Sequence, residues 1–360
     1  MKPVFISDCE GPISKNDNAF EITEHFVPNG DRLFTLISKY DDVLADVLRK
    51  PGYSAGSTLK LILPFLKAYN VTDSQVERFS ARNLILIANS KATLEQVRTL
   101  ASTFIVSTSY EHYIRTLCEA LDFPFSNTYC TRLSLDGYSI ESIEKRRLRK
   151  IAAQITRMPM ISIPKTAKST EDFAEKDQET LTLLDEIFWT EIPQMGIGKI
   201  LSEVKTIGGE QKAEAIKDVV KRLDADLSDV MYVGDSITDV EAFELVRENC
   251  GLTVSFNGNS YAVKNAELAV LSENNLITVL IADIFFKYGK KKTLQFSENW
   301  SIERLRTSGM STLLLERFLS MHSSALPKVK IVTAQNMEAL VKESSEFRKK
   351  VRGKAIGRLG

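Results

Sequence analysis

Residues 4–12 read Val-Phe-Ile-Ser-Asp-Cys-Glu-Gly-Pro, and this stretch decides how the rest of the chain is interpreted. Its first four residues predict a buried β-strand, which the Gly-Pro pair ends. Side chains alternate along an extended segment, so Asp8 and Glu10 point to one side and Cys9 to the other. In open α/β sheets ligands bind beyond the carboxyl ends of the strands, where two acids indicate a nucleophile, a proton-transfer group or a metal site. An acidic turn without a chemical role is the alternative.

The composition is that of a folded protein larger than one small domain. The chain has 360 residues, of which 43% are hydrophobic and 26% are charged. At ~100–200 residues per domain, this length predicts a core with one or two additions. Lys+Arg and Asp+Glu both number 47, so no global charge attracts the protein to nucleic acid or to an anionic membrane.

The cysteines and the apolar runs predict a cytoplasmic protein without a membrane span. The four cysteines form no C-x-x-C pair, which argues against a zinc site or a redox dithiol and fits a reducing compartment. The longest apolar run, Leu276 to Phe286, falls short of the ~20 residues that cross a bilayer. A strand that begins within the first few residues leaves no room for a signal peptide.

Two segments show helical periodicity and no strong strand signal. Residues 13–89 predict an all-helical insertion directly after the first strand, with Asn16 or Asp17 as a helix cap. Residues 139–205 predict a second helical insertion, within which Ser169 resembles the start of a helix that ends near Thr190.

A second buried strand over residues 103–106 ends in three hydroxyl side chains, Ser107, Thr108 and Ser109, and a helix is predicted over 110–121. Free N–H groups at a helix start can hold a phosphate. Hydroxyls that only cap the helix are the alternative. Further strands are predicted over the ranges 129–135, 229–233, 252–256 and 268–271.

A lysine and two aspartates mark the later part of the core. Lys212 lies in the first turn of a helix predicted to end at Leu223, where the helix dipole disfavours a cation by ~0.3–1 kcal/mol. We therefore expect an anion beside it; a solvated lysine is the alternative. The sequence Gly-Asp-Ser-Ile-Thr-Asp at 234–239 follows the strand 229–233, so Asp235 and Asp239 can converge there.

The last part of the chain, from residue 290, predicts a mostly helical extension. Helices are expected over 302–322 and 336–352, with a short strand at 329–332 between them. From residue 344 one acid, Glu346, accompanies six basic residues: Arg348, Lys349, Lys350, Arg352, Lys354 and Arg358. A solvated or disordered tail is the prediction, and a docking surface for an acidic partner is the alternative.

Taken in order, D-x-E-G after the first strand, a hydroxyl after the second, a lysine opening a later helix and G-D-S-x-x-D after the third resemble the four motifs of the haloacid dehalogenase superfamily. Phosphoserine phosphatase-like members are the most similar, and the D-C-E-G-P opening also resembles archaeal members described as a subunit of an energy-converting hydrogenase. The resemblance implies a doubly wound parallel α/β sheet with a helical cap. It places the catalytic core at 1–12, 90–138 and 206–289, the cap at 13–89, a second insertion at 139–205 and an extension at 290–360.

The resemblance also implies roles for the residues that match the motifs. Asp8 corresponds to the nucleophile that takes the phosphoryl group, and Glu10 to the general acid and base. Ser107, with Thr108 beside it, and Lys212 correspond to the groups that bind the phosphate. Mg²⁺ would be held by Asp8, the backbone carbonyl of Glu10, Asp235 and, directly or through water, Asp239.

The resemblance therefore implies a Mg²⁺-dependent phosphomonoesterase that acts on a small phosphorylated metabolite through an aspartyl-phosphate. One position departs from the pattern, because Glu10 stands where the family usually has Asp. The extra methylene moves the carboxyl by ~1.5 Å, a displacement that can cost ~100-fold in rate. The alternative is an accessory or regulatory protein that keeps the fold and acts through a protein partner at its insertion or its basic tail.

Overall fold

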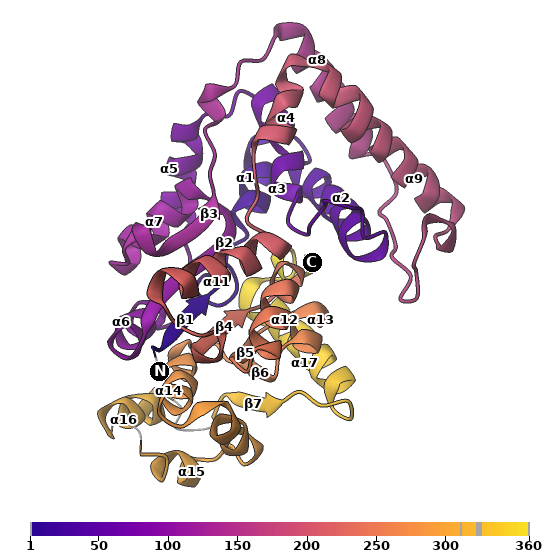
Figure 1. The fold of residues 1–360 in the computed structure, drawn as a ribbon. Coiled ribbons are helices and arrows are strands. Elements are labelled where there is room, and N and C mark those ends of the chain that lie inside the picture. Colours follow the sequence, from indigo (N-terminus) through magenta and orange to yellow (C-terminus); the bar gives the residue numbers. More distant parts are fainter. Residues whose placement is uncertain (1, 310–311, 322–325, 359–360) are drawn as a thin grey trace.

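The core of the protein is one seven-stranded sheet with helices on both faces (Figure 1). The computed structural model describes residues 2–309, 312–321 and 326–358. The strand order is β3-β2-β1-β4-β5-β6-β7, in which β7 pairs antiparallel with β6 and all other pairs are parallel. The strands are β1 Val4–Ser7, β2 Ser102–Tyr110, β3 Thr128–Thr131, β4 Val230–Gly234, β5 Leu252–Phe256, β6 Leu268–Leu271 and β7 Lys328–Ile331. This confirms the predicted doubly wound α/β core.

Alternate residues of β1 enter separate hydrophobic clusters on the two faces of the sheet. Phe5 belongs to one cluster, and Val4 and Ile6 belong to the other, as expected where helices cover both faces of a parallel sheet. The helices that contribute to the Phe5 cluster include α6 Ser90–Leu100, α7 Glu111–Leu121 and α14 Leu276–Glu298. The helices that contribute to the opposite cluster are α11 Gly209–Leu223, α12 Val240–Glu248 and α13 Ser260–Asn265.

The register of the central strands brings three chain segments to the same edge of the sheet. Ser7, the last residue of β1, pairs with Ile105 of β2 and with Val233 of β4. The N–H of Asp8 then donates to the carbonyl of Val233 at 2.8 Å. The residues that follow these strand positions therefore lie next to one another.

The two helical insertions pack together into one hydrophobic cluster above the sheet (Figure 1). Phe188 is buried at their contact, where its ring centroid lies 5.8 Å from that of Tyr40 and 6.2 Å from that of Phe65. The helices of the first insertion are α1 Asn18–Phe26, α2 Gly30–Asp42, a π-helical turn Val43–Val47, α3 Thr58–Leu61, α4 Leu63–Ala68 and α5 Asp73–Asn83. Those of the second are α8 Ser142–Ile155, α9 Glu175–Glu186, a π-helical turn Ile187–Glu191 and α10 Ile200–Glu203.

Some predicted boundaries are wrong. The predicted strand over 129–135 ends at Thr131, and β2 continues to Tyr110 instead of ending at Val106. The helix predicted over 302–322 is divided into α15 Ile302–Arg306 and α16 Thr312–Met321, while residues 310, 311 and 322 lie outside the described ranges. Single 3₁₀ turns lie at Phe125–Asn127, Leu135–Gly137, Thr170–Asp172, Ile192–Gln194, Gly196–Lys199, Leu227–Asp229, Ile237–Asp239 and Ile356–Arg358.

The C-terminal extension is part of the core. Strand β7 adds to the sheet beside β6, and helix α17, Met337–Arg352, packs on α13. Helix α17 confirms the helix predicted over 336–352, whereas the prediction of a solvated or disordered tail from residue 344 is wrong as far as Arg352. Arg348 and Arg352 are both buried in it. The prediction was wrong because basic side chains are rarely buried unless they are paired, and a partner distant in the sequence is invisible to a local pattern.

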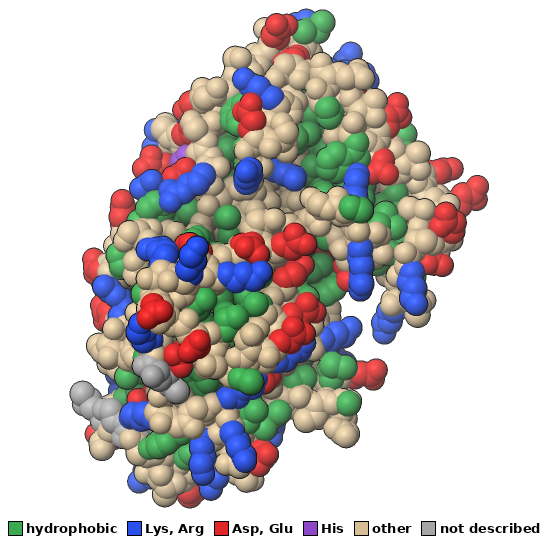
Figure 2. Space-filling model, viewed as in Figure 1, with side chains coloured by type: hydrophobic (Ala, Val, Ile, Leu, Met, Phe, Trp, Pro, Cys, Tyr) green, Lys and Arg blue, Asp and Glu red, His purple; other side chains and the backbone are tan. Residues whose placement is uncertain are grey.

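The charged surface agrees with the equal numbers of acids and bases. Figure 2 shows basic and acidic side chains interspersed over the face that it presents. Within the described ranges, no helix combines the length and the apolar character that crossing a bilayer requires.

We predict that Phe188→Ala destabilises the protein by ~3–5 kcal/mol, because it leaves a cavity where the two insertions meet. Urea unfolding measures the free energy. Ile143→Ala in α8 is the control, since that side chain is 64% exposed, and we expect it to change stability by less than ~0.5 kcal/mol. Equal effects of the two substitutions would contradict a shared core of the insertions.

Candidate active site

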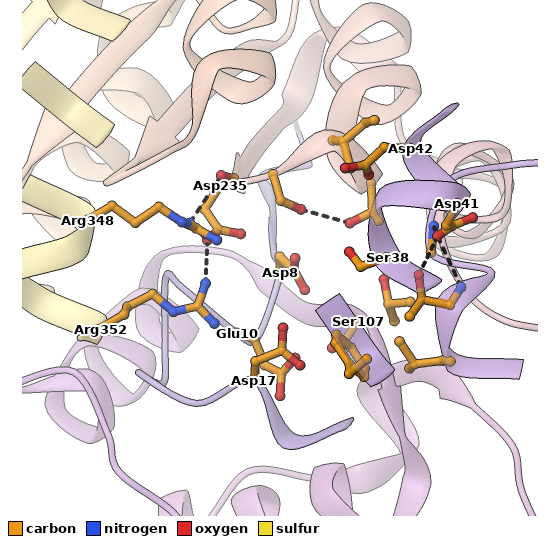
Figure 3. Close-up of a pocket in the computed structure, with 18 residues that line it drawn as sticks. Asp8, Glu10, Asp17, Ser38, Asp41, Asp42, Ser107, Asp235, Arg348 and Arg352 are labelled. Carbon is orange, nitrogen blue, oxygen red and sulfur yellow. Dashed lines mark hydrogen bonds and ion pairs between the residues drawn. The ribbon is translucent and has the colours of Figure 1, made fainter. Parts of the chain in front are cut away.

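A cavity of ≈ 110 Å³ lies at the carboxyl ends of the central strands, between the sheet, the first helical insertion and α17 (Figure 3). Asp8 follows β1, Ser107 lies in β2 and Asp235 follows β4, and all three line it. The first insertion contributes its opposite wall. The lining residues of that insertion are Asp17, Phe34, Ser38, Asp41, Asp42, Gly56, Thr58 and Leu59.

Lys212 is fully buried and joins two of the predicted site residues. Its Nζ lies 2.7 Å from Asp8 Oδ2 and 2.7 Å from Asp239 Oδ1. Burial alone would lower the pKa of Lys212, but the carboxylates of Asp239 and Asp8 raise it above its ordinary value. The anion expected beside this helix start is therefore a pair of carboxylates, and Lys212 stays charged.

Asp239 is held by five donors. Its Oδ1 accepts hydrogen bonds from Lys212 and from the Tyr232 hydroxyl at 2.7 Å. Its Oδ2 accepts from the backbone N–H groups of Asp235 at 2.8 Å and Ser236 at 3.0 Å, and from the Ser236 hydroxyl at 3.5 Å. Burial would raise the pKa of Asp239, but Lys212 and the other donors lower it. Both oxygens have at least two partners, so Asp239 is placed to fix Lys212 and the Asp235 loop.

Asp8 is more weakly stabilised as an anion than Asp239. Its Oδ1 accepts from the Cys9 N–H at 2.6 Å and its Oδ2 from Lys212. Burial raises the pKa of Asp8 to about 7 although Lys212 lowers it, and the nearby Asp239 and Asp235 raise it further. A bound cation would favour the charged form.

Glu10 shares the cavity with Asp8, as the alternation of side chains predicted, while Cys9 lies in a hydrophobic cluster. Glu10 Oε1 accepts the N–H of Asn18, the first residue of α1, at 2.7 Å. Burial and the neighbouring Asp17 raise the pKa of Glu10 well above its ordinary value. A carboxyl in this environment keeps a proton that it can donate.

Asp17 was expected only as a helix cap, and it does accept the N–H of Phe20 at 3.0 Å. It also lines the cavity beside Glu10, and burial raises its pKa. Sequence alone gave no sign of this second position, because it depends on how the insertion returns to the strand edge.

The hydroxyl cluster does not begin a helix. Ser107 and Thr108 lie inside β2, whose pairing with β3 is irregular between Val106 and Tyr110, and α7 begins only at Glu111 with no side-chain cap. The helix-cap alternative is therefore wrong for these residues, and phosphate binding by them stays a prediction that cannot rest on a helix start. Ser107 and Thr108 still line the cavity, and the buried Thr108 Oγ1 has no hydrogen-bond partner among the described residues.

Two arginines of α17 reach the cavity, and sequence reasoning missed both. Arg348 Nη1 and Arg352 Nη1 both contact Asp235 Oδ2, the latter at 3.0 Å (Figure 3). They are one helical turn apart, on the face that also buries Leu340 and Ser344. Their four-residue spacing in line with Leu340 and Ser344 was the sequence signal that could have indicated their burial.

The remaining geometry fits a hard divalent cation. Asp8, Asp235 and Asp239 each offer an oxygen, and these atoms lie within 4.8 Å of one another. Asp239 is already saturated, which leaves Asp8 and Asp235 as the charged donors. No described group donates a hydrogen bond to Asp235 Oδ1, so this oxygen is available to a metal although both arginines contact Oδ2. Carboxylate oxygens are the donors that Mg²⁺ prefers.

Comparison with known proteins identifies relatives of the core. The family model of haloacid dehalogenase-like hydrolases matches residues 137–283. The solved structure of gene product AF1437 from Archaeoglobus fulgidus superposes with a TM-score of 0.78 at 25% identity, covering 100% of this chain and 99% of that one. None of the curated proteins matches the sequence.

Phosphoserine phosphatase is more distant. Its apo structure aligns at 14% identity and a TM-score of 0.47, covering 81% of this chain and 100% of that one. A phospho-aspartyl intermediate analogue of phosphoserine phosphatase aligns at 14% identity and a TM-score of 0.45, covering 80% and 99%. Structural similarities with TM-scores this low add no evidence to the match with the family model.

We predict that Gly11→Ala disrupts the site. Gly11 has φ +104°, which other residues rarely adopt, and a Cβ there would overlap the carboxylate of Asp235. The strain should cost ~1–3 kcal/mol of stability, measured by urea unfolding. Gly52→Ala, with φ +71° and no atom near its Cβ, is the control for backbone strain alone. Equal losses of stability would contradict a specific contact with Asp235.

A second prediction concerns Asp42, where burial raises the carboxyl pKa to about 7. In the unfolded chain this pKa is ~3.9. Between pH ~4 and ~7 the native state therefore binds more protons than the unfolded state, and Asp42 makes stability fall as pH rises. Asp42→Asn should remove this pH-dependent contribution. As pH rises from ~4 to ~7, the stability of the variant relative to wild type should therefore increase, by at most ~1.4 kcal/mol per pH unit.

Urea unfolding at pH 5 and pH 8 measures the difference. The control is Asp31→Asn, which removes an exposed carboxylate from the same helix. If Asp42→Asn and Asp31→Asn had the same pH dependence, the burial of Asp42 would not control stability in this range.

Proposed function

We propose that this chain, whose residues 137–283 match the family model of haloacid dehalogenase-like hydrolases, is a Mg²⁺-dependent phosphomonoesterase of that superfamily acting on a small phosphorylated metabolite. The observation that carries this proposal is the position of Asp8. It is buried at the end of β1, held by Lys212, with the carboxyl groups of Glu10 and Asp235 in the same cavity. A nucleophile and a proton donor therefore share one cavity, and a positive charge lies directly behind the nucleophile.

Asp8 acts as the nucleophile. An oxygen of its carboxylate attacks phosphorus, the bond from phosphorus to the leaving oxygen breaks, and an aspartyl-phosphate forms. Lys212, 2.7 Å from Asp8 Oδ2, offsets the negative charge of the carboxylate as the phosphate approaches. Asp239 keeps Lys212 charged through both steps.

Glu10 acts as the acid and then as the base. Its raised pKa leaves a proton on the carboxyl, which it gives to the leaving oxygen. As a carboxylate it then takes a proton from the water that attacks the aspartyl-phosphate, which releases phosphate and restores Asp8. The hydrogen bond from the Asn18 N–H at 2.7 Å fixes the longer side chain of Glu10, so the extra methylene is anchored at the start of α1.

Mg²⁺ would be held by the carboxylates of Asp8 and Asp235 and by the backbone carbonyl of Glu10, with Asp239 supporting the loop. When bound, it supplies positive charge to the phosphate oxygens. Its two charges also offset the carboxylates that crowd this end of the sheet.

The enclosure of the cavity supports a small substrate. The first insertion is tied to the core near the cavity by Ser54 Oγ to Gln211 Oε1 at 2.8 Å and by the Tyr261 hydroxyl to Asp46 Oδ2 at 2.8 Å. A space of ≈ 110 Å³ under this cover excludes a folded phosphoprotein. We propose no nucleic-acid partner, because the chain has equal numbers of acidic and basic residues.

The cellular setting that we propose is the cytoplasm. All four cysteines, three of them buried, are free thiols. Free thiols persist where the environment is reducing.

The test is turnover of a panel of small phosphomonoesters with Mg²⁺, with Glu10→Gln as the diagnostic variant. This substitution keeps the size of the side chain and removes proton transfer, which typically costs ~10²–10⁴-fold. With acetyl phosphate, whose leaving group needs little protonation, Asp8 should still be phosphorylated. The aspartyl-phosphate should then accumulate, seen as a phosphate-sized mass increase that hydroxylamine removes.

Two variants serve as controls for this experiment. Asp8→Asn together with Glu10→Gln should show no mass increase, because the nucleophile is absent. Asp122→Asn, an exposed carboxylate at the end of α7, should leave turnover unchanged. If the wild type neither hydrolysed any ester nor became phosphorylated, the accessory-protein alternative would replace the enzyme.

A further inference from the structure

Arg348 has hydrogen-bonding capacity that the protein does not use. It is 3% exposed, and its Nη1 contacts the carboxylate and backbone carbonyl of Asp235 and the carbonyl of Asn257. Its buried Nε has no partner among the described residues, and none of their hydrogen bonds involves its Nη2. The Nε and Nη2 groups form one edge of the guanidinium, which matches two oxygens of a phosphate.

Arg352, one turn later, differs from Arg348 because all three of its nitrogens are engaged. Nη1 donates to Asp235, Nε donates to the carbonyl of Lys15 at 3.0 Å, and Nη2 donates to the carbonyl of Asn16. These contacts tie α17 to the segment after β1. Arg352 is therefore a positioning residue, whereas Arg348 has two nitrogens, Nε and Nη2, without a hydrogen bond to the described residues.

The charges around the cavity make a free cationic donor significant. Six acidic side chains line it, namely Asp8, Glu10, Asp17, Asp41, Asp42 and Asp235. Among the described lining residues, the basic side chains are Arg348 and Arg352, and Lys212 lies behind Asp8 outside the lining. A phosphate dianion entering this space meets repulsion that these two arginines offset.

Thr108 gives a second, independent sign of a missing ligand. Its buried Oγ1 is unpartnered and belongs to the wall formed by β2, whereas Arg348 belongs to the wall formed by α17. A buried polar atom without a partner costs ~1–3 kcal/mol, so two of them lining one small cavity indicate a polar ligand between them.

We infer that Arg348 is a further substrate-binding residue, whose Nε–Nη2 edge binds oxygens of the phosphate group that Asp8 attacks. The assignment of this phosphate as the transferred group rests on the proposed function. The position follows from the contacts. Arg348 Nη1 contacts Asp235, and carboxylate oxygens of Asp235 and Asp8 lie within 4.8 Å of each other. The guanidinium and the nucleophile therefore lie on either side of the Asp235 carboxylate in the same cavity.

The test measures binding of inorganic phosphate, without turnover, by isothermal titration calorimetry with and without Mg²⁺. Arg348→Gln should weaken the Kd by ~10-fold or more, as expected for the loss of charged hydrogen bonds. Arg348→Lys keeps the charge but cannot form the bidentate contact, so its Kd should lie between those of wild type and Arg348→Gln. Lys350→Gln removes a charge from the exposed side of the same helix, where Lys350 pairs with Glu273, and should leave the Kd unchanged.

A second measurement asks whether the bound phosphate is the transferred one. In the Glu10→Gln background, Arg348→Gln should slow phosphorylation of Asp8 by acetyl phosphate ~10-fold or more, whereas Lys350→Gln should not. A purely structural Arg348 would change stability without changing either readout. Equal phosphate Kd values for wild type and Arg348→Gln would overturn the inference, as would a wild type that binds no phosphate.

The outcomes separate this inference from the proposed function. Hydrolysis by wild type together with unchanged phosphate binding in Arg348→Gln would overturn the inference alone. Arg348-dependent phosphate binding without hydrolysis or phosphorylation would support the binding site and overturn the proposed enzyme. If Arg348→Gln failed to fold by circular dichroism, Arg348→Lys would decide, and a phosphate Kd equal to that of wild type would count against the site.

Discussion

The burial of the Lys212 ammonium group constrains the whole active site. A buried charge costs several kcal/mol unless it is paired and hydrogen-bonded, and Lys212 has no solvent exposure. Its two partners come from the ends of β1 and β4, so the sheet register and helix α11 must agree for the ion pairs to form. The partners are unequal. The Asp239 carboxylate accepts five hydrogen bonds and its pKa is lowered, whereas that of Asp8 accepts two and its pKa is raised to about 7. The weaker partner is the carboxylate that faces the cavity, which suits a group that must react.

Three segments that are far apart in the sequence meet at the carboxylate of Asp235. Asp235 Oδ2 accepts from Arg348 and Arg352, and the same carboxylate lies against Gly11, where a Cβ would not fit. The turn after β1, the loop after β4 and the last long helix are thereby packed around one carboxylate. The C-terminal extension, despite its basic composition, thus supplies two of the contacts that hold a proposed metal ligand.

Much of the core could be predicted from local sequence because it depends on local physics. A parallel strand buried on both faces is a continuous apolar run, so β1, β4, β5 and β6 were predicted to within a residue of their ends. Alternation placed Asp8 and Glu10 on one side. The surroundings of Ser107 and Arg348, in contrast, could not be predicted from local sequence. The first lies in a strand whose irregular pairing depends on β3, and the second is paired with a residue 113 positions away. Neither the pairing of β2 with β3 nor the ion pair of Arg348 with Asp235 can be detected from about ten neighbouring residues of sequence.

Glu10 illustrates how a departure from a pattern can be absorbed by its surroundings. In an unsupported turn, a carboxyl displaced by ~1.5 Å would be badly placed for proton transfer. Here the first insertion returns to the strand edge so that α1 begins at Asn18, whose free N–H donates a hydrogen bond to the carboxyl of the longer Glu10 side chain at 2.7 Å. The same return brings Asp17 beside Glu10, and this second carboxylate, together with burial, raises the pKa of Glu10. The insertion therefore does more than cover the cavity, because its first helix holds the Glu10 carboxyl and Asp17, just before that helix, contributes to the raised pKa of Glu10.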